Sequence, residues 1–253
     1  KPPSFRVDNK VNTLTYGEKT SNLLINHDRT DFYNSSTVFN VGVKKFKKLK
    51  SDFNFKFNAN LRILFSMQDA DDGSADDLNL YYKKVDTFFD QTQNFFTQNN
   101  IHVTARHHPR ANQKLKKHFL HRFSFIENLN ENTSLESCLR QHNLHITFNS
   151  SSAIEASYLS IPTVFLELEN PKNGDFPCLS SEYVFYKQLG YPLHSFLVKN
   201  AEEFICLVRS FNQKDFEHNQ LLVWNWVNDL NIDFDHNFLR LILEKKLKLG
   251  IKK

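Results

Sequence analysis

A chain of 253 residues with 40% hydrophobic side chains, including 25 Phe, can bury a sizeable core in one or two domains, which excludes an intrinsically disordered protein. The formal net charge of +4 comes from 32 basic and 28 acidic residues, and so balanced a surface argues against nucleic-acid binding. Three widely spaced cysteines favour reduced thiols in the cytoplasm over a disulfide framework.

The first part of the chain has a different composition from the rest. Residues 1–58 are rich in Asn, Ser, Thr and Lys with weak periodicity, and we expect irregular structure there with one short strand near Val38–Val43. From residue 59 the pattern becomes regular, so residues 59–253 are predicted to form a separate domain. The Asn-, Lys- and Phe-rich segment 44–60 is a candidate linker.

From Leu61 onward, short apolar runs of strand length alternate with segments of helical periodicity. The expected strands are Leu61–Ser66, Ile101–Ala105, Phe123–Ile126, Leu144–Phe148, Thr163–Glu167 and Phe196–Val198. The expected helices are Asp76–Gln98, Thr133–His142, Ser152–Leu159, Ser181–Leu189, Ala201–Phe211, Phe216–Asp229 and Asp235–Lys248. This alternation predicts an α/β fold: a Rossmann-like parallel sheet with helices on both faces, and ligands at the carboxyl ends of the strands.

A polar loop with two imidazoles and two guanidinium groups follows the second of these strands. It reads Arg106-His107-His108-Pro109-Arg110. Arg106 and Arg110 could bind a phosphate bidentately, or they could simply be exposed loop residues. His108 is the candidate functional residue, although it could also be a surface histidine beside a turn-forming proline; structural roles are expected for His107 and His102.

Three consecutive hydroxyl side chains lie between a strand and a helix. Ser150, Ser151 and Ser152 follow the strand Leu144–Phe148, where the free N–H groups and positive dipole end of the next helix favour an anion. The alternative is a capping box, because Ser152 and Glu155 stand in the relation S-x-x-E. A cap would use one hydroxyl and leave the other two unexplained.

An acidic loop, Asp69–Asp77, follows the first strand. Its last part reads as a helix cap and first-turn acids. The earlier residues Asp69, Asp71 and Asp72 could accept a proton from an acceptor hydroxyl, bind sugar hydroxyls, hold a divalent ion or form a solvated loop. No Cys/His spacing matches a tetrahedral zinc site, and no metal is expected.

These motifs resemble those of GT-B glycosyltransferases that use CMP-activated sugars: a His-Pro loop, a Ser-rich turn and a Glu in the following helix. The run from Ile63 to Ser74 is similar to the glutamine-then-acidic loop of bacterial capsule-synthesis Kdo transferases. Bacterial sialyltransferases and polysialyltransferases share the His-Pro and Ser motifs. The resemblance covers residues 38–200. Because 39–46 is similar to the crossover into the second domain of such enzymes, residues 1–58 are expected to be a remnant of an N-terminal acceptor domain with its linker.

The resemblance implies roles for individual residues. His108, with Pro109, would lie against the nucleotide phosphate and stabilise the charge on the departing CMP. The donor-binding set implied by the family pattern, with the neighbouring arginines, is Gln68, Arg106, His108, Pro109, Arg110, Ser150, Ser151, Ser152 and Glu155. Asp71 and Asp72 are the candidates for the base. However, the acidic-acidic-Gly motif of sialyltransferases lies in their N-terminal half, so this assignment is a hypothesis.

The prediction is an inverting, metal-independent glycosyltransferase without a cofactor. It would transfer an acidic sugar of the Kdo or sialic acid type from a CMP-sugar donor to a bacterial surface glycan or glycolipid acceptor. Two alternatives stay open: a CDP-glycerol-type polyol phosphate transferase or UDP-sugar enzyme on the same scaffold, and a non-catalytic nucleotide-binding partner domain. A cytoplasmic location is expected, and the basic tail Lys245–Lys253 could contact the anionic inner membrane surface.

Overall fold

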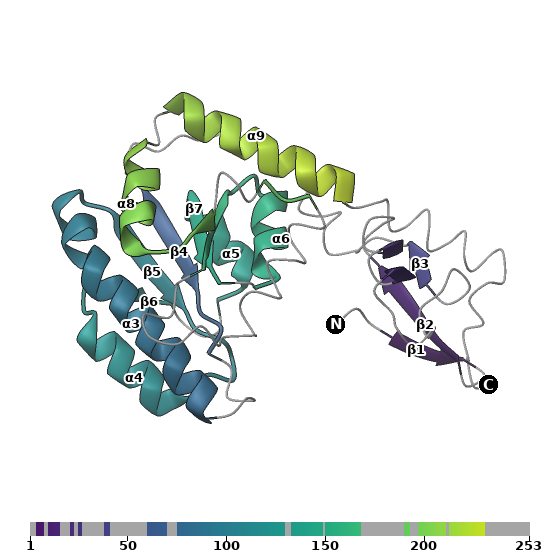
Figure 1. Cartoon of the computed structure of the whole chain (residues 1–253), viewed down its shortest axis with the longest axis horizontal. Coiled ribbons are helices and arrows are strands. Elements are labelled where there is room, and N and C mark those ends of the chain that lie inside the picture. The colour runs from purple at the N-terminus through teal and green to yellow at the C-terminus, as the bar shows by residue number, and fades with distance from the viewer. Residues whose placement is uncertain are drawn as a thin grey trace.

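The computed structural model describes twelve segments of the chain (Figure 1). They are residues 4–7, 10–15, 21–22, 25–26, 38–40, 60–69, 75–129, 133–148, 150–167, 190–192, 197–210 and 213–230. The expected helices Ser181–Leu189 and Asp235–Lys248 lie outside these segments, as do the candidate bases Asp71 and Asp72.

The main element is a six-stranded sheet in which every pair of neighbours is parallel. Its order is β6-β5-β4-β7-β8-β9, so the direction of the strand order reverses between β4 and β7. The strands are β4 (Arg62–Ser66), β5 (His102–Arg106), β6 (Glu127–Asn128), β7 (Leu144–Thr147), β8 (Thr163–Leu166) and β9 (Leu197–Val198). This is the predicted Rossmann-like arrangement, and a ligand crevice is expected at the reversal.

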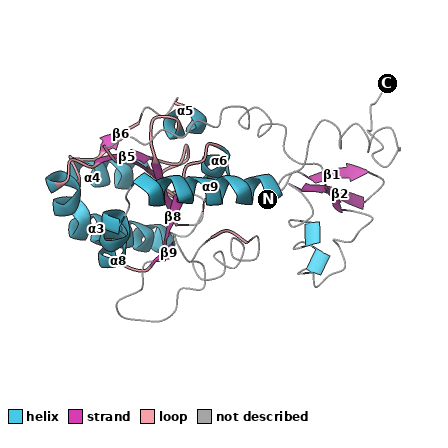
Figure 2. Cartoon of the chain, turned by 90° about the horizontal axis from the view of Figure 1, so that it is seen from above, coloured by secondary structure: helices cyan, strands magenta, loops and turns pink. Residues whose placement is uncertain are grey.

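Helices cover both faces of this sheet, as the sequence predicts (Figures 1 and 2). Helices α3, α4 and α8 contribute to the core on one face, whereas α5 and α6 contribute to the core on the other, and α9 packs on α6. Their bounds are α3 (Ala75–Gln98), α4 (Gln113–Arg122), α5 (Leu135–Leu139), α6 (Ser152–Tyr158), α8 (Ala201–Ser210) and α9 (Gln213–Leu230). Among the described residues, no helix is long and apolar enough to cross a bilayer.

Alternation along β4 explains how one strand serves both cores. Ile63 and Phe65 enter the larger core under α3, while Leu64 enters the smaller core under α5 and α6. All three are fully buried, so the strand has a continuous apolar run in place of a polar face. The larger core is mainly aromatic: the ring of Phe89 lies 5.3 Å from that of Phe65 and 5.6 Å from that of Phe119.

Two expectations about this domain differ from the structure. The apolar run Phe123–Ile126 is not a strand, since the N–H of Phe123 caps α4 and the N–H of Ile126 closes a turn on Phe123; the strand β6 begins one residue later. The sequence prediction also missed α4. Its cap is Asn112, whose Oδ1 accepts the N–H groups of Lys114 and Leu115 at 3.1 and 3.2 Å.

The first 58 residues are more regular than expected. Strands β1 (Ser4–Val7) and β2 (Lys10–Thr15) pair antiparallel, and β3 (Val38–Asn40) pairs parallel with β2. The strand expected near Val38 is confirmed, but the hairpin was not foreseen. Because Val7 pairs with Lys10, only Asp8 and Asn9 separate the two strands, and this pair of turn-forming residues was the available signal.

We predict that Phe89→Ala lowers the free energy of unfolding by about 3 to 5 kcal/mol, because it removes a fully buried ring and leaves a cavity. Urea titration followed by circular dichroism would measure the change. Leu221→Ala is the matched control, since Leu221 is 44% exposed. Equal midpoints for the two variants would contradict the assigned core.

Candidate functional site

The three loops singled out in the sequence follow strands that are neighbours in the sheet. In the strand register, Ser66 of β4 pairs with Arg106 of β5, and Phe65 pairs with Ile146 of β7. The segment from Met67, the loop from His107 and the turn from Ser150 therefore leave the same edge of the sheet, at the reversal of strand order. The structure thus brings the His-Pro loop and the serine turn to one edge.

A buried carboxylate joins two of these loops. Asp69 has no exposed surface, and each of its oxygens accepts hydrogen bonds. Oδ1 accepts the backbone N–H of His108 at 2.8 Å. Oδ2 lies 2.6 Å from Nδ1 of His107 and 2.7 Å from the hydroxyl of Tyr82, which donates to it. Three donors, two from the loop after β5 and one from α3, thus surround this carboxylate.

Asp69 is ionised in this environment. Burial raises its pKa, but the hydrogen bond and charge of His107, the His108 N–H and the Tyr82 hydroxyl together outweigh burial and leave the pKa below its usual value. A metal, sugar or proton-accepting role was one sequence hypothesis for Asp69. The structure contradicts that hypothesis for this residue, because its oxygens are enclosed and face protein donors.

His107 is structural, as expected, and buried. Its ring packs edge-on against Phe119 with the centroids 5.8 Å apart, and its Nδ1 faces Asp69. Among the described residues, its buried Nε2 has no hydrogen-bond partner.

His108 has the opposite environment. It is half-buried, and its Nδ1 accepts the backbone N–H of Arg110 at 3.1 Å, so the neutral ring carries its proton on Nε2. Among the described residues, that Nε2 has no hydrogen-bond partner. Pro109 and Arg110 beside it are exposed. The chemistry of this loop is a fixed imidazole with one N–H available for an acceptor such as a phosphate oxygen.

Arg106 ends β5 at this edge. Its guanidinium hydrogen-bonds the thiol of Cys138 in α5, where burial raises the thiol pKa and the arginine opposes that rise. The backbone carbonyl of Arg106 accepts the N–H of Met67 at 2.9 Å, extending the β4–β5 ladder. Gln68 follows, and its N–H donates to the hydroxyl of Tyr81 at 2.8 Å. Arg106 and Gln68, two members of the predicted donor-binding set, therefore lie at strand ends and have protein partners.

The three hydroxyl groups of the serine turn have different contacts. Ser150 Oγ accepts the N–H of Ser152 at 3.2 Å, and the buried Ser152 Oγ lies 3.2 Å from Nε2 of His145. Ser151 is exposed and is the N-cap residue of α6, but its side chain makes no cap hydrogen bond. The capping-box alternative is wrong, because Ser152 lies inside the helix. That alternative therefore does not account for Glu155, which is half-buried in the first turn.

The buried histidine that contacts Ser152 in this turn, His145, also contacts two neighbouring strands. His145 Nε2 also lies 2.8 Å from Ser66 Oγ, and its Nδ1 lies 2.9 Å from Thr163 Oγ1. Complete burial, with a smaller contribution from His142, lowers its pKa to about 3, so the ring is neutral at pH 7. Sequence reasoning missed His145. The available signal was a polar residue within each of three strands that are neighbours in the sheet: Ser66, His145 and Thr163.

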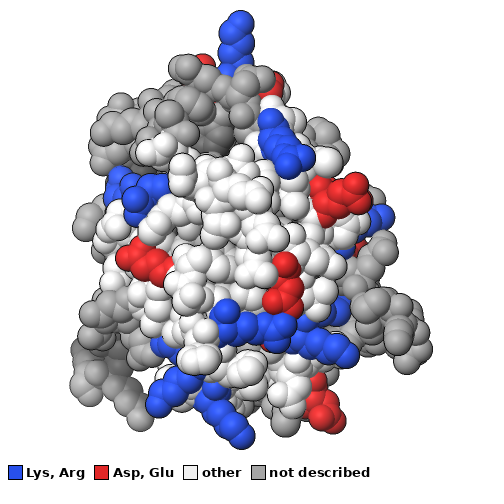
Figure 3. Space-filling view, turned by 90° about the vertical axis from the view of Figure 1, so that its left-hand side faces the viewer, with Lys and Arg blue, Asp and Glu red and all other residues white. Residues whose placement is uncertain are grey.

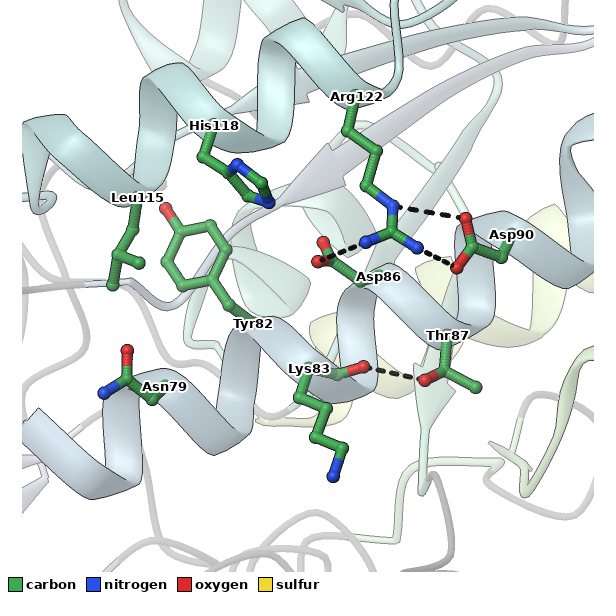
Figure 4. A pocket seen from close by; sticks show the side chains of 9 residues that line it. All are labelled: Asn79, Tyr82, Lys83, Asp86, Thr87, Asp90, Leu115, His118 and Arg122. Carbon is green, nitrogen blue, oxygen red and sulfur yellow. Dashed lines mark hydrogen bonds and ion pairs between the residues drawn. The ribbon is translucent and has the colours of Figure 1, made fainter.

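A groove of about 270 Å³ lies between α3 and α4. Figure 4 shows Arg122 reaching toward Asp86 and Asp90, which line it. The Tyr82 hydroxyl on its wall donates to Asp69. Basic and acidic side chains are interspersed over the face of the molecule seen in Figure 3, with no single-sign field. Among the described residues, no group of three His, Cys, Asp or Glu side chains could hold a metal ion.

Comparison with known proteins identifies the fold. No protein-family model and no curated protein sequence matches the chain. The S. aureus MnaA–UDP co-structure matches with a TM-score of 0.53 and 14% identity, over 92% of this chain and 58% of that one. A variant of the wall teichoic acid polymerase TagF matches with a TM-score of 0.50 and 10% identity, over 96% of this chain and 59% of that one.

The chain has a Rossmann-like fold that matches enzymes of the GT-B type. It spans less than three fifths of the length of these two structures. The Kdo transferase KpsC of Thermosulfurimonas dismutans also matches, at 16% identity over 46% of this chain and 36% of that one, but its TM-score of 0.34 is too low to support an argument.

The buried His145 predicts a specific pH dependence. Its folded pKa of about 3 lies below the unfolded value of about 6.5, so between these values the unfolded state binds one more proton. Stability is therefore lost as pH falls from about 6.5, by up to about 1.4 kcal/mol per pH unit. We expect His145→Asn to flatten this slope, measured by urea titration at several pH values. His121→Asn, at an exposed position, is the control. A slope unchanged by His145→Asn would contradict the buried neutral ring.

Proposed function

We propose that the chain is the nucleotide-binding domain of an inverting, metal-independent glycosyltransferase. It would take an acidic sugar of the Kdo or sialic acid type from a CMP donor to a surface-glycan acceptor. The observation that supports this most strongly is the fixed ring of His108 at the same sheet edge as the exposed Ser151, at the reversal of strand order. Ligands of doubly wound folds bind at that position.

The proposed chemistry follows from these side chains. As the bond between the sugar and CMP breaks, negative charge grows on the phosphate oxygens. The Nε2–H of His108 would donate to one of these oxygens, and the hydroxyl of Ser151 to another. The histidine lowers the barrier because its ring is already oriented. A carboxylate would take the proton of the acceptor hydroxyl. Asp71 and Asp72 are the proposed bases, and Glu155 the proposed contact to ribose or base.

Two other functions are supported by particular observations. MnaA matches in fold and was solved with UDP, which favours a UDP nucleotide as the second candidate ligand. TagF matches in fold and is a wall teichoic acid polymerase, which favours a polyol phosphate transferase using a CDP donor. A silent nucleotide-binding partner domain is a further candidate on the same fold.

The assignment of His108 has a direct test. We expect His108→Ala to lower kcat for sugar transfer by about 100-fold or more, the usual cost of removing one preorganised donor to developing charge. The melting temperature should not change, because the ring is half-buried and, among the described residues, it bonds only the N–H of Arg110. His121→Ala, exposed on α4, is the matched control. Unchanged turnover in His108→Ala would refute the assigned role.

Nucleotide preference separates the candidate donors. Calorimetric titration of the full chain with CMP, CDP and UDP should give the tightest binding for CMP. Ser151→Ala should weaken that binding roughly tenfold, the value of one hydrogen bond to a charged group. Ser137→Ala, exposed on α5, is the control and should bind as the native chain does. A preference for UDP would remove the CMP assignment, and binding without any transfer would favour the silent partner domain.

A further inference from the structure

We propose that Asp69 is a positioning residue of the donor site, which holds His108 in the orientation needed to reach the nucleotide phosphate. The proposal rests on the proposed function, because it concerns how that site is built. Asp69 itself is enclosed and would not touch the donor.

The position of Asp69 in the sheet explains why a side chain is needed here. The backbone ladder between β4 and β5 ends with the bond from the Met67 N–H to the Arg106 carbonyl, 2.9 Å long. Beyond that bond the segments that follow β4 and β5 separate into loops. Two residues further along, the Asp69 carboxylate accepts the next available loop amide, that of His108. One side chain thus extends the connection between the loops past the last backbone pair.

Three contacts set the orientation of His108, and this carboxylate makes the first of them. Asp69 holds the backbone N–H of His108, the N–H of Ala111 donates to its carbonyl at 2.9 Å, and the N–H of Arg110 donates to its ring Nδ1. The peptide and the ring are therefore both fixed, which leaves Nε2 as the nitrogen that can donate. Losing the contact to Asp69 would free the residue at the start of this turn.

The environment of Asp69 makes this anchor strong and costly to disturb. A buried ionised carboxylate is tolerated because His107, His108 and Tyr82 together donate to both of its oxygens. A charge-assisted bond to a backbone N–H is stronger than a neutral one. Removing the acceptor would leave the His107 ring and the His108 N–H unpaired in a buried place, so the loop would rearrange.

A purely structural role for Asp69 gives different predictions from a positioning role. If Asp69 acts only on stability, its loss and the loss of His108 should affect turnover independently. If it acts through His108, the second loss should add nothing after the first. A double-mutant cycle measures this difference.

The experiment compares Asp69→Ala, His108→Ala and the double variant in sugar-transfer kinetics. We expect Asp69→Ala to lower kcat roughly 100-fold, since a displacement of about 1 Å can cost that much, and the double variant to match His108→Ala. Asp69→Asn keeps one oxygen for the His108 N–H and should recover most of the loss. Asp90→Ala is the control, because Asp90 is an exposed residue of α3 whose side chain pairs with Arg122. Losses that multiply in the double variant, or no recovery by Asp69→Asn, would overturn the proposal.

A second measurement tests the anchor without relying on catalysis. Amide hydrogen exchange of His108, followed by NMR, should be slow in the native chain and in Asp90→Ala but at least tenfold faster in Asp69→Ala. Equal exchange rates in all three would overturn the anchor. If the native chain neither binds nucleotide nor transfers sugar while Asp69→Ala exchanges faster, the proposed function fails and the anchor stands as a structural fact.

Discussion

The architecture of the site depends on one constraint: all six strands of the sheet run parallel, and their order reverses between β4 and β7. At such a reversal the connections leave in opposite directions, so the loops after the two central strands separate and open a crevice. Every candidate donor-binding residue ends or follows β4, β5 or β7, the three strands at and beside that point. The strand order thus determines which loops lie next to one another, and the side chains of those loops determine which ligand they can bind.

Buried polar groups then fix the two loops that matter most. Asp69 ties the segment after β4 to the His-Pro loop, on the face covered by α3 and α4, whereas His145 ties Ser66, Ser152 and Thr163 together on the other face. The Asp69 carboxylate is charged and the His145 ring is neutral. Donors surround the carboxylate and keep it ionised, while burial keeps the imidazole neutral. Both oxygens of Asp69 and both ring nitrogens of His145 have protein partners, so these polar groups can be buried beside this edge of the sheet.

Much of the fold could be predicted because continuous apolar runs such as Ile63–Phe65 identify buried parallel strands. Helix α4 was missed because its mean hydropathy is low and its core contact depends on few residues, above all Phe119. The run Phe123–Ile126 was misassigned because burial and strand formation give the same apolar pattern over four residues. The contacts of Asp69 and His145 could not be derived from the sequence, because all of their partners except Ser152 lie 13 to 79 residues away.

The difference between His107 and His108 shows what the sequence leaves undecided. Neighbouring residues at a strand end point to opposite sides, and which side is the core depends on tertiary packing. Here Phe119 and Asp69 enclose the ring of His107, so the ring of His108 is directed away from that contact and is held by the turn that Pro109 and Arg110 form. His107 therefore influences the direction of the His108 ring. Its enclosure, together with the carboxylate that binds both residues, determines that the second imidazole of the pair, and not the first, is available at the surface.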